Sequence, residues 1–588
     1  MNEKTDFWSS RQRIAAAMLL VALSGVLLFT LRASQQTADS LDYALSARTG
    51  QGMFHPHHLL FIPLVRLSLQ GLSALGAPPD PILAGQIHNL LWAMIAVLCL
   101  FLIAERLLSS TFGGLLAALF LLVARGFWLY STQLEVYVPA TGCLALLTAV
   151  LLLRPRRTFG TGLWVVLSIL LALSVLYHQS NLFFCLPLGY WILRRCDGPR
   201  GRLLPVLALA GLLVLAGYVL AFHYTDVERR IPEILSSAQK DTLRGFLRFP
   251  LAYGFHPSPG WGTLSNVSVM GVGRLVHSQV RDLITFPWPL RFVVIPGFAA
   301  AMAGLVLWHT VQSARGAAHT PARRFLVIWL VTYDLFFLWW FPGEKEFFIT
   351  SLFPLTLLAA LAVKDLADRL GTRGAHRALA RGVCLTLLGG VAAVNAAQTI
   401  LPYHRDRGPA YAAALVLARR SPPGCLMIGD YTVGQNLRYY FQRERVWEAA
   451  MPLFYFYRDL LLPDRYRLAE EPCITADLSS VSPWFSLGGF DAQNHPEGWA
   501  RYMKWLLGLE RDSRSRGLSC RKFEGMGDIE GSTYLRLWAD REPVDGIRQV
   551  FRRLDVAIGQ SVGGDRPFET WLDSAPPHSF PEGVGGDS

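Results

Sequence analysis

Long apolar runs separated by short polar loops make up the first 400 residues of the chain. A run of roughly 17 to 25 apolar residues is long enough to cross a bilayer as a helix. We therefore predict eleven transmembrane helices, at about residues 14–31, 82–104, 113–130, 136–153, 162–176, 180–193, 203–222, 292–312, 325–341, 347–363 and 382–401. The first run could instead be a cleaved signal peptide, although it is long for one.

The loops between these runs predict the orientation of the chain. Loops on the cytoplasmic side of a membrane protein are short and rich in Lys and Arg. With a cytoplasmic N-terminus, the inner loops are the basic segments 154–157, 194–202, 314–324 and 364–381. An odd number of spans then places residues 402–588 on the outer side. We expect a multi-pass protein of the bacterial inner or plasma membrane.

Composition agrees with this class of protein. The chain is 52% hydrophobic and 17% charged, whereas soluble domains carry about 25% charged residues. The formal charge of +12 could suggest nucleic acid, but each of the inner loops is basic, as expected for a membrane protein. The eight cysteines show no CxxC or Cys/His finger spacing, so no zinc module is predicted. The expected surroundings are the lipid bilayer, with no nucleic-acid partner.

The outer side carries two long loops in the transmembrane part, which covers residues 1–401. The first outer loop, 32–81, contains an apolar segment at 57–75 that includes a proline and an arginine, so we expect it to lie along the membrane interface. The second, 223–291, contains "DVERRIPEILSSAQKDTLRGFLRF", which predicts an amphipathic helix.

The long apolar runs end before residue 402. "GCLMIGD" predicts a buried strand that leads into a helix at "GQNLRYYFQRE", and "CITADL" and "STYLRLW" predict further strands. Residues 402–565 should therefore form a small extracytoplasmic α/β domain. The Pro- and Gly-rich tail, 566–588, is predicted to be disordered.

Polar residues that could carry chemistry gather in the outer segments. Asp39 and Asp42 precede the stretch "HPHH", which is residues 55–58. The other short outer loops hold Glu135 and Tyr137, His178 and Gln179, and Glu344, Lys345 and Glu346. Together they predict an active site on the outer face, assembled from helices that are distant in sequence.

This layout resembles the GT-C superfamily of membrane glycosyltransferases, with an architecture like that of dolichyl-phosphate mannosyltransferases. The resemblance rests on "SLDYAL", the His-Pro stretch, "LEVYVP" and "PGEKEFF". It implies an α-helical polytopic enzyme that transfers a sugar from a polyprenyl-phosphate donor to a glycan, lipid or protein acceptor. It also implies that Asp42 is the catalytic base. The second acidic residue that customarily follows is absent, since Tyr43 stands there.

The residue types suit such a reaction. The leaving lipid phosphate needs cations or hydrogen-bond donors, and the candidates are Lys345 first, then His55, His58 and His178. Residues that could position acceptor or donor are Glu135, Tyr137, Gln179, Glu344 and Glu346. A monophosphate can leave without a divalent ion and there is no DxD motif, so we expect no required cofactor, although a metal is possible.

Each assignment has a structural alternative. Asp42 could cap a helix beginning near Leu41, and Asp39 could be the base instead. Glu135 could simply end a span. His178 and Gln179 could cap a hairpin.

The three histidines of "HPHH" allow several readings. They could bind a metal, contact phosphate, or pack at the interface. Pro56 suits the first turn of a helix, so the stretch could mark the start of the interfacial helix, and an anion could bind there. We favour phosphate or hydroxyl contact for His55 and His58, and assign no role to His57.

Three further features bear on function. Asp334 lies inside a span and could face a lipid cavity or bond a Tyr or Ser of a neighbouring helix. Asn266 begins an outward sequon. Cys425, Cys473 and Cys520 would face an oxidising space, where at most one disulfide could join two of them. A transporter or flippase of lipid-linked glycans, or a noncatalytic assembly subunit, is the rival function.

Overall fold

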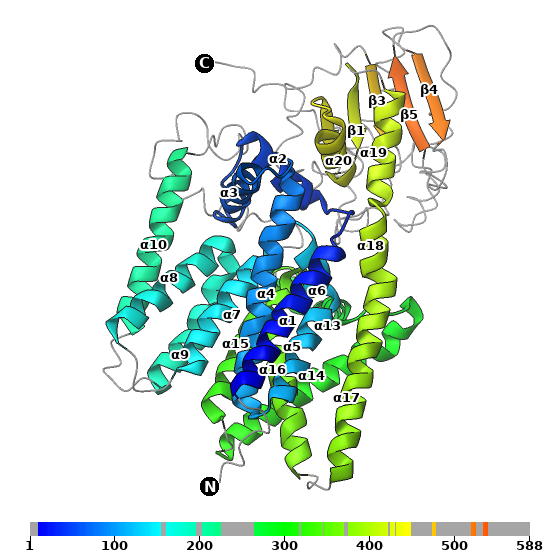
Figure 1. Cartoon of the computed structure of the whole chain (residues 1–588). Helices are drawn as coiled ribbons and strands as arrows, with labels where there is room; N and C mark the ends of the chain where they lie inside the picture. Colours follow the sequence, from blue (N-terminus) through cyan, green and yellow to red (C-terminus); the bar gives the residue numbers. More distant parts are fainter. Residues whose placement is uncertain are drawn as a thin grey trace. The chain divides into compact units, whose positions relative to one another are not determined.

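The computed structural model is mostly helical (Figure 1). It describes residues 10–154, 160–195, 203–224, 264–316, 319–344, 346–369, 374–421, 424–429, 431–448, 473–477, 519–524 and 533–538. The chain divides into two compact units, residues 1–407 and 408–588. The first unit is a helical bundle, and the second contains the described strands.

Every predicted span lies on a helix of the bundle. The helices on these spans are α1 (Ser10–Thr30), α4 (Pro81–Leu108), α5 (Thr111–Val123), α6 (Arg125–Thr132), α7 (Tyr137–Leu153), α8 (Thr161–Tyr177), η2 (Gln179–Phe184), α9 (Cys185–Arg195), α10 (Leu203–Tyr224), α14 (Arg291–Ala314), α15 (Thr320–Trp340), α16 (Ile349–Arg369) and α17 (Gly374–Asn395). A π-helical segment, η8 (Ala396–Ile400), and α18 (Leu401–Arg405) continue α17.

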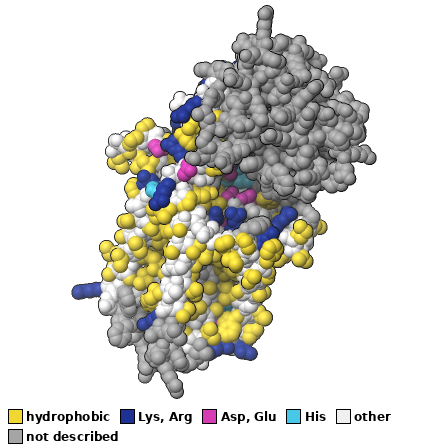
Figure 2. All heavy atoms as spheres, turned by 90° about the vertical axis from the view of Figure 1, so that its right-hand side faces the viewer, with side chains coloured by type: hydrophobic (Ala, Val, Ile, Leu, Met, Phe, Trp, Pro, Cys, Tyr) yellow, Lys and Arg dark blue, Asp and Glu magenta, His cyan; other side chains and the backbone are white. Residues whose placement is uncertain are grey.

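Six helical stretches among the described residues are long and apolar enough to cross a membrane, or seven if one bent pair counts as a span. Hydrophobic side chains cover most of the flank of the bundle in Figure 2, with charged side chains towards its two ends. The chain is therefore an integral membrane protein. The count of eleven spans and the orientation of the termini stay predictions.

The predicted span 113–130 is not one straight helix. α5 and α6 are bent by 63° at Ala124, whose backbone is extended in ψ. Asn395 holds this break, because its Nδ2 donates to the carbonyls of Val123 and Leu283 at 2.9 and 2.8 Å. The bend was not predicted, because an apolar run shows the length of a span but not its bends.

Two short helices lie at one end of the bundle, which we call the α2–α3 end (Figure 1). They are α2 (Ala38–Thr49) and α3 (Phe61–Ala74). Gly50 ends α2 with φ of 78°, and Arg66 of α3 donates to the carbonyl of Ala47 at 2.9 Å. α3 covers most of the segment 57–75, which was predicted to lie along the membrane interface.

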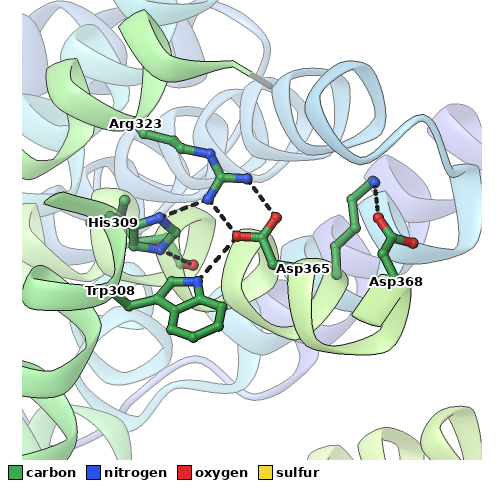
Figure 3. A network of polar contacts seen from close by, with 7 residues as sticks. Trp308, His309, Arg323, Asp365 and Asp368 are labelled. Carbon is green, nitrogen blue, oxygen red and sulfur yellow. Dashed lines mark hydrogen bonds and ion pairs between the residues drawn. The ribbon is translucent and has the colours of Figure 1, made fainter. Parts of the chain in front are cut away.

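A buried polar network near the C-terminal end of α16 ties α14, α15 and α16 together (Figure 3). Arg323 of α15, 2% exposed, forms a bidentate pair with Asp365 of α16, with both N–O distances 2.7 Å. Trp308 of α14 also donates to Asp365. His309 of α14 accepts from Arg323 through Nδ1, so its Nε2 carries the proton that it donates to the carbonyl of Leu358.

An amphipathic helix that the sequence did not predict, α13 (Val269–Leu283), follows the short η5 (Leu264–Asn266). A second short turn, η6 (Trp288–Leu290), leads into α14. The helix predicted at "DVERRIPEILSSAQKDTLRGFLRF" lies outside the described residues. Asn266 is 8% exposed, and its Nδ2 donates to the carbonyls of Trp339 and Trp340. The amide of the sequon is therefore buried and hydrogen-bonded in this fold.

The second unit contains helices packed beside a mixed sheet. Its elements are α19 (Gly408–Arg420), β1 (Leu426–Gly429), α20 (Tyr431–Phe441), β2 (Val446–Glu448), β3 (Cys473–Asp477), β4 (Ser519–Glu524) and β5 (Thr533–Trp538). The strand order is β2-β1-β3-β5-β4, with β2, β1 and β3 parallel and the other pairs antiparallel. The three predicted strands and the predicted helix lie on these elements. Cys425 is disulfide-bonded, and the tail 566–588 lies outside the described residues.

Candidate active site

The first part of the first outer loop forms the short helix α2, which is capped by Thr37 and not by Asp42. Thr37 is the N-cap, because its side chain accepts from the backbone N–H of Ser40 at 3.0 Å. Asp42 lies one turn inside the helix. The reading of Asp42 as a cap is therefore wrong, because the helix begins three residues earlier than predicted.

Glu135 lies in the short loop between α6 and α7, and α4 fixes this loop. The Nδ2 of Asn89 donates to the carbonyls of Tyr130, Gln133 and Glu135, at 3.2, 2.8 and 2.7 Å. Gln86, one turn earlier, donates to the carbonyl of Thr132. These hydrogen bonds hold the backbone of the loop against α4 and so set the position of Glu135.

The carboxyl group of Glu135 faces the start of α2. Its Oε1 accepts hydrogen bonds from the hydroxyls of Thr37 and Ser40. The side chain is 2% exposed. Burial, and next the negative charge of Asp39, raise the pKa of Glu135 to about 8. Glu135 therefore does more than end a span, since it joins the first loop to the loop after α6.

A third carboxyl group comes from the turn η7 (Glu346–Phe348). Tyr130 of α6 donates to Oε2 of Glu346 at 2.9 Å. The charges of Glu135, Asp39 and Glu344 all act on Glu346. Asp39, Glu135 and Glu346, which we call the acidic cluster, thus come from three segments that are far apart in sequence.

The "HPHH" stretch forms a tight turn and does not begin a helix. The backbone N–H of His58 donates to the carbonyl of His55 at 3.0 Å, and their rings stack with centroids 4.0 Å apart. α3 begins later, at Phe61. The prediction that Pro56 sits in a first helical turn was wrong, because proline suits the second position of a turn equally well.

The turn is fixed against the segment after α8. The carbonyl of Pro56 accepts from the side chains of Gln179 and Tyr218, at 2.9 and 2.6 Å. The backbone N–H of Gln179 donates to the carbonyl of His57 at 2.9 Å. Gln179 thus positions the histidine turn and does not merely cap a hairpin.

Ring contacts connect the histidine turn to the acidic cluster. His58 lies between Tyr43 of α2 and His178, with centroids 5.1 and 6.4 Å away. His178 in turn lies 5.2 Å from the ring of Tyr137, and its Nδ1 bonds Ser180 at 2.7 Å. The described residues predicted from four loops are therefore contiguous.

Two of these histidines are neutral near pH 7. Burial lowers the pKa of His57 to about 4. Burial, and next the charge of His57, lower the pKa of His178 to about 3. His178 can accept or donate a hydrogen bond, but it brings no positive charge to a phosphate.

The positive charge near the acidic cluster comes from two arginines that were not predicted from the sequence. Arg281 of α13 and Arg125 of α6 both act on the phenol of Tyr130. Burial, and next the charge of Arg125, lower the pKa of Arg281. Arg125 donates to Thr399 and to the carbonyl of Arg281. Lys345, the leading cation from the sequence, lies outside the described residues.

The described residues contain no group of three or more His, Cys, Asp or Glu with the geometry of a metal site. His55 and His58 are stacked face to face with an angle of 5° between their ring planes. Two histidines that bind one metal ion instead point their ring nitrogens toward a common centre. The absence of a required divalent ion stays a prediction.

Asp334 accepts a hydrogen bond from Ser351 of α16 at 2.9 Å. Of the two predicted surroundings of Asp334, this is the hydrogen bond to a serine of a neighbouring helix.

The sequence did contain a signal for the residues that position the loop. Gln86, His88 and Asn89 are polar residues close together in an apolar span. Such residues in a membrane helix face other helices and find polar partners. Here the amides bond backbone carbonyls, and His88 contacts the hydroxyl of Tyr177 at 3.0 Å.

Replacing Asn89 by Ala should destabilise the protein by about 2 kcal/mol, because three buried carbonyls lose their donor. Leu91→Ala on the same helix is the control, since Leu91 is 52% exposed and should change stability little. Thermal unfolding in detergent measures both. Equal stability of the two variants would show that the amide does not hold the loop.

No known protein-family model and no curated protein matches the sequence. Solved structures do resemble the fold. ArnT from Cupriavidus metallidurans bound to undecaprenyl phosphate gives a TM-score of 0.50 at 14% identity, over 78% of this chain and 92% of that chain.

Two other structures are similar over comparable lengths of this chain. The Archaeoglobus fulgidus oligosaccharyltransferase gives 0.45 at 11% identity, over 79% of this chain and 68% of its own. The mycobacterial arabinofuranosyltransferase AftD gives 0.43 at 14%, over 92% and 40%. Of the three, only the likeness to ArnT has a TM-score that reaches 0.50, and it covers nearly all of the ArnT chain. The chain therefore has the same fold as ArnT, and the architecture predicted from the sequence resemblance is confirmed at the level of the fold.

Proposed function

We propose that the protein is a membrane glycosyltransferase that moves a sugar from a polyprenyl-phosphate donor to an acceptor hydroxyl. The observation that carries the proposal is the contiguous site at the α2–α3 end. It combines the carboxyl groups of the acidic cluster with Arg125 and Arg281, whose charges act on Tyr130, the hydrogen-bond donor to Glu346. The likeness of fold to ArnT, which was solved with undecaprenyl phosphate, supports the choice of donor.

The reaction needs a base for the acceptor. The acceptor oxygen attacks C1 of the sugar, its proton passes to a carboxylate of α2, and the bond from C1 to the phosphate oxygen breaks. Asp42 is the position implied by the family resemblance. The charges of both aspartates act on Tyr43, but Asp39 also acts on Glu135 and Glu346. The arrangement favours Asp39, and either residue fulfils the role of a first-loop base.

The leaving group takes the electron pair of the broken bond and becomes a lipid phosphate. Fixed cations stabilise the charge that grows on it. Arg281 is the candidate that the structure adds, and Lys345 is the candidate from the sequence. His55, His58 and His178 would then serve as hydrogen-bond partners, and Tyr137, Gln179, Glu344 and Glu346 would shape the site around the sugar and acceptor.

Binding of undecaprenyl phosphate to the purified protein tests the proposal. We expect the lipid to raise the unfolding temperature, since a ligand that binds only the folded state stabilises it. Undecaprenol, which lacks the phosphate, should raise it much less. Arg281→Gln should reduce the shift, whereas Arg369→Gln, an exposed arginine over the ring of Trp308, should leave it unchanged.

Transfer is then measured as release of undecaprenyl phosphate from a panel of sugar-loaded donors. Phosphate-dependent binding together with release establishes the activity. Equal shifts by both lipids, with no release from any donor, would overturn the proposal. Binding and movement of an intact donor across a vesicle membrane without release would identify a transporter or flippase instead, and neither release nor movement would favour an assembly subunit.

A further inference from the structure

Glu135 is held from two sides. Asn89 of α4 bonds the carbonyl of Glu135 at 2.7 Å, and the hydroxyls of Thr37 and Ser40 donate to its Oε1. Thr37 and Ser40 are the N-cap and the third residue of α2. The side chain of Glu135 therefore fixes the first turn of α2, which also contains Asp39.

The charged groups that face Glu135 are acidic. Asp39 comes from α2 and Glu346 from η7, while the phenols of Tyr43 and Tyr137 complete the surroundings. Among the described residues, no Lys or Arg forms an ion pair with Glu135. Carboxylates crowded in a buried place cannot all be ionised, so at least one of them keeps its proton.

Opposing effects act on the proton of Glu135. The two hydroxyl donors and the N-terminus of α2 favour the charged carboxylate. Burial and the charge of Asp39 favour the neutral acid, and their effect is larger, because the pKa of Glu135 rises to about 8.

We propose that Glu135 is a positioning residue that works as the neutral acid beside the negative charge of Asp39. Its neutral state leaves Asp39 as the ionised member of the pair and holds the first turn of α2 against the loop after α6. The inference rests on the proposed function, in which Asp39 receives the acceptor proton. In each turnover that proton passes to Asp39 and then to water, while Glu135 keeps its own.

The proposal predicts an alkaline limit for the reaction. Above pH about 8, Glu135 ionises, and its carboxylate repels that of Asp39. The first turn of α2 then loses its alignment, and transfer falls. A Gln at position 135 carries no titratable proton but keeps the shape of the neutral acid.

Two variants test whether the neutral side chain of Glu135 is sufficient: Glu135→Gln keeps its shape without an ionisable group, and Glu135→Ala removes the side chain. We expect Glu135→Gln to keep transfer within about 5-fold and to lose the alkaline limit, because Gln mimics the neutral acid. Glu135→Ala should lose about 100-fold, since a small misplacement of the base is enough to do so. Equal loss in both variants would mean that the carboxylate form is needed and would overturn the proposal.

Two readouts do not depend on transfer. Infrared difference spectra of the intact protein at pH 7 should contain a protonated-carboxyl band that is absent in Glu135→Gln. The control is Asp368→Asn, which removes a carboxyl group with 60% of its side chain exposed and should leave the band. A band unchanged in Glu135→Gln would overturn the inference even if transfer were found.

The second readout is stability against pH. A carboxyl group with a raised pKa in the folded state stabilises the protein at low pH and loses this effect as pH rises through that pKa. The unfolding temperature of the wild type relative to Glu135→Gln should therefore fall between about pH 4.5 and about pH 8 and be level above. A level difference throughout would contradict a neutral Glu135. A fall without any transfer activity would leave the neutral acid intact and refute the proposed function.

Discussion

Asp39→Asn abolishes most sugar transfer, by about 10²–10⁴-fold, if Asp39 is the base. Asn keeps the size of the side chain but cannot accept the acceptor proton. A loss of this size corresponds to about 3–5 kcal/mol in the barrier. The measurement is the rate of undecaprenyl phosphate release from the purified variant, with its unfolding temperature as the check on folding.

Asp42→Asn is the matched comparison, because it lies on the same helix one turn later and is likewise half-buried. It should lose less than about 10-fold, an effect smaller than removal of a general base. The reverse order of the two variants would assign the base to Asp42, as the family resemblance implies. Full activity in both would show that neither carboxylate is the base.

Asp365→Asn should destabilise the protein by about 3–5 kcal/mol, because it breaks a buried ion pair and leaves the charge of Arg323 uncompensated. Arg323 is 2% exposed, and its two terminal nitrogens both bond Asp365. Thermal unfolding in detergent, with transfer or lipid binding as a separate readout, measures the effect. Lipid binding by the folded fraction should be unchanged, because the network lies near the C-terminal end of α16, whereas Glu346 of the site lies just before its N-terminal end.

A double variant separates the value of the pair from the cost of an isolated charge. Arg323→Met with Asp365→Leu removes both charges and should recover most of the lost stability. The control pair, Lys364 and Asp368, is largely exposed, with 35% and 60% of the side chains accessible. Breaking it should cost less than about 0.5 kcal/mol. Equal effects of the two pairs would contradict a structural role for the buried network.

The helical part of the fold could be predicted because apolar length depends on the bilayer alone. All eleven predicted ranges lie on helices, including the short pair α8 and α9. The bend at Ala124 could not be predicted, because it depends on Asn395, which is more than 270 residues away. α13 was missed because its apolar residues form a stripe within a polar loop, without a long run.

The candidate site was predicted as a set of outer loops but not as a set of contacts. The loops after α6 and α8 do meet the first loop, as Glu135 and Gln179 show. The cap at Thr37 and the turn at Pro56 were not predictable, because each residue suits two local conformations and the partner side chains select one. Arg125 was not predicted because it lies within a predicted span, and Arg281 was not predicted because it lies in the long outer loop 223–291, whereas the candidate residues come from the first outer loop and the short ones.

The connector between α1 and α2 has a consequence for the order in which the molecule matures. The backbone N–H groups of Ser34 and Gln35 donate to the carbonyl of Tyr403, and His404 bonds the carbonyl of Arg32 at 2.7 Å. These partners are about 370 residues apart, so ribosomal synthesis makes one of them long before the other. The connector that precedes α2 therefore gains these hydrogen bonds only after the segment that follows α17 has been synthesised.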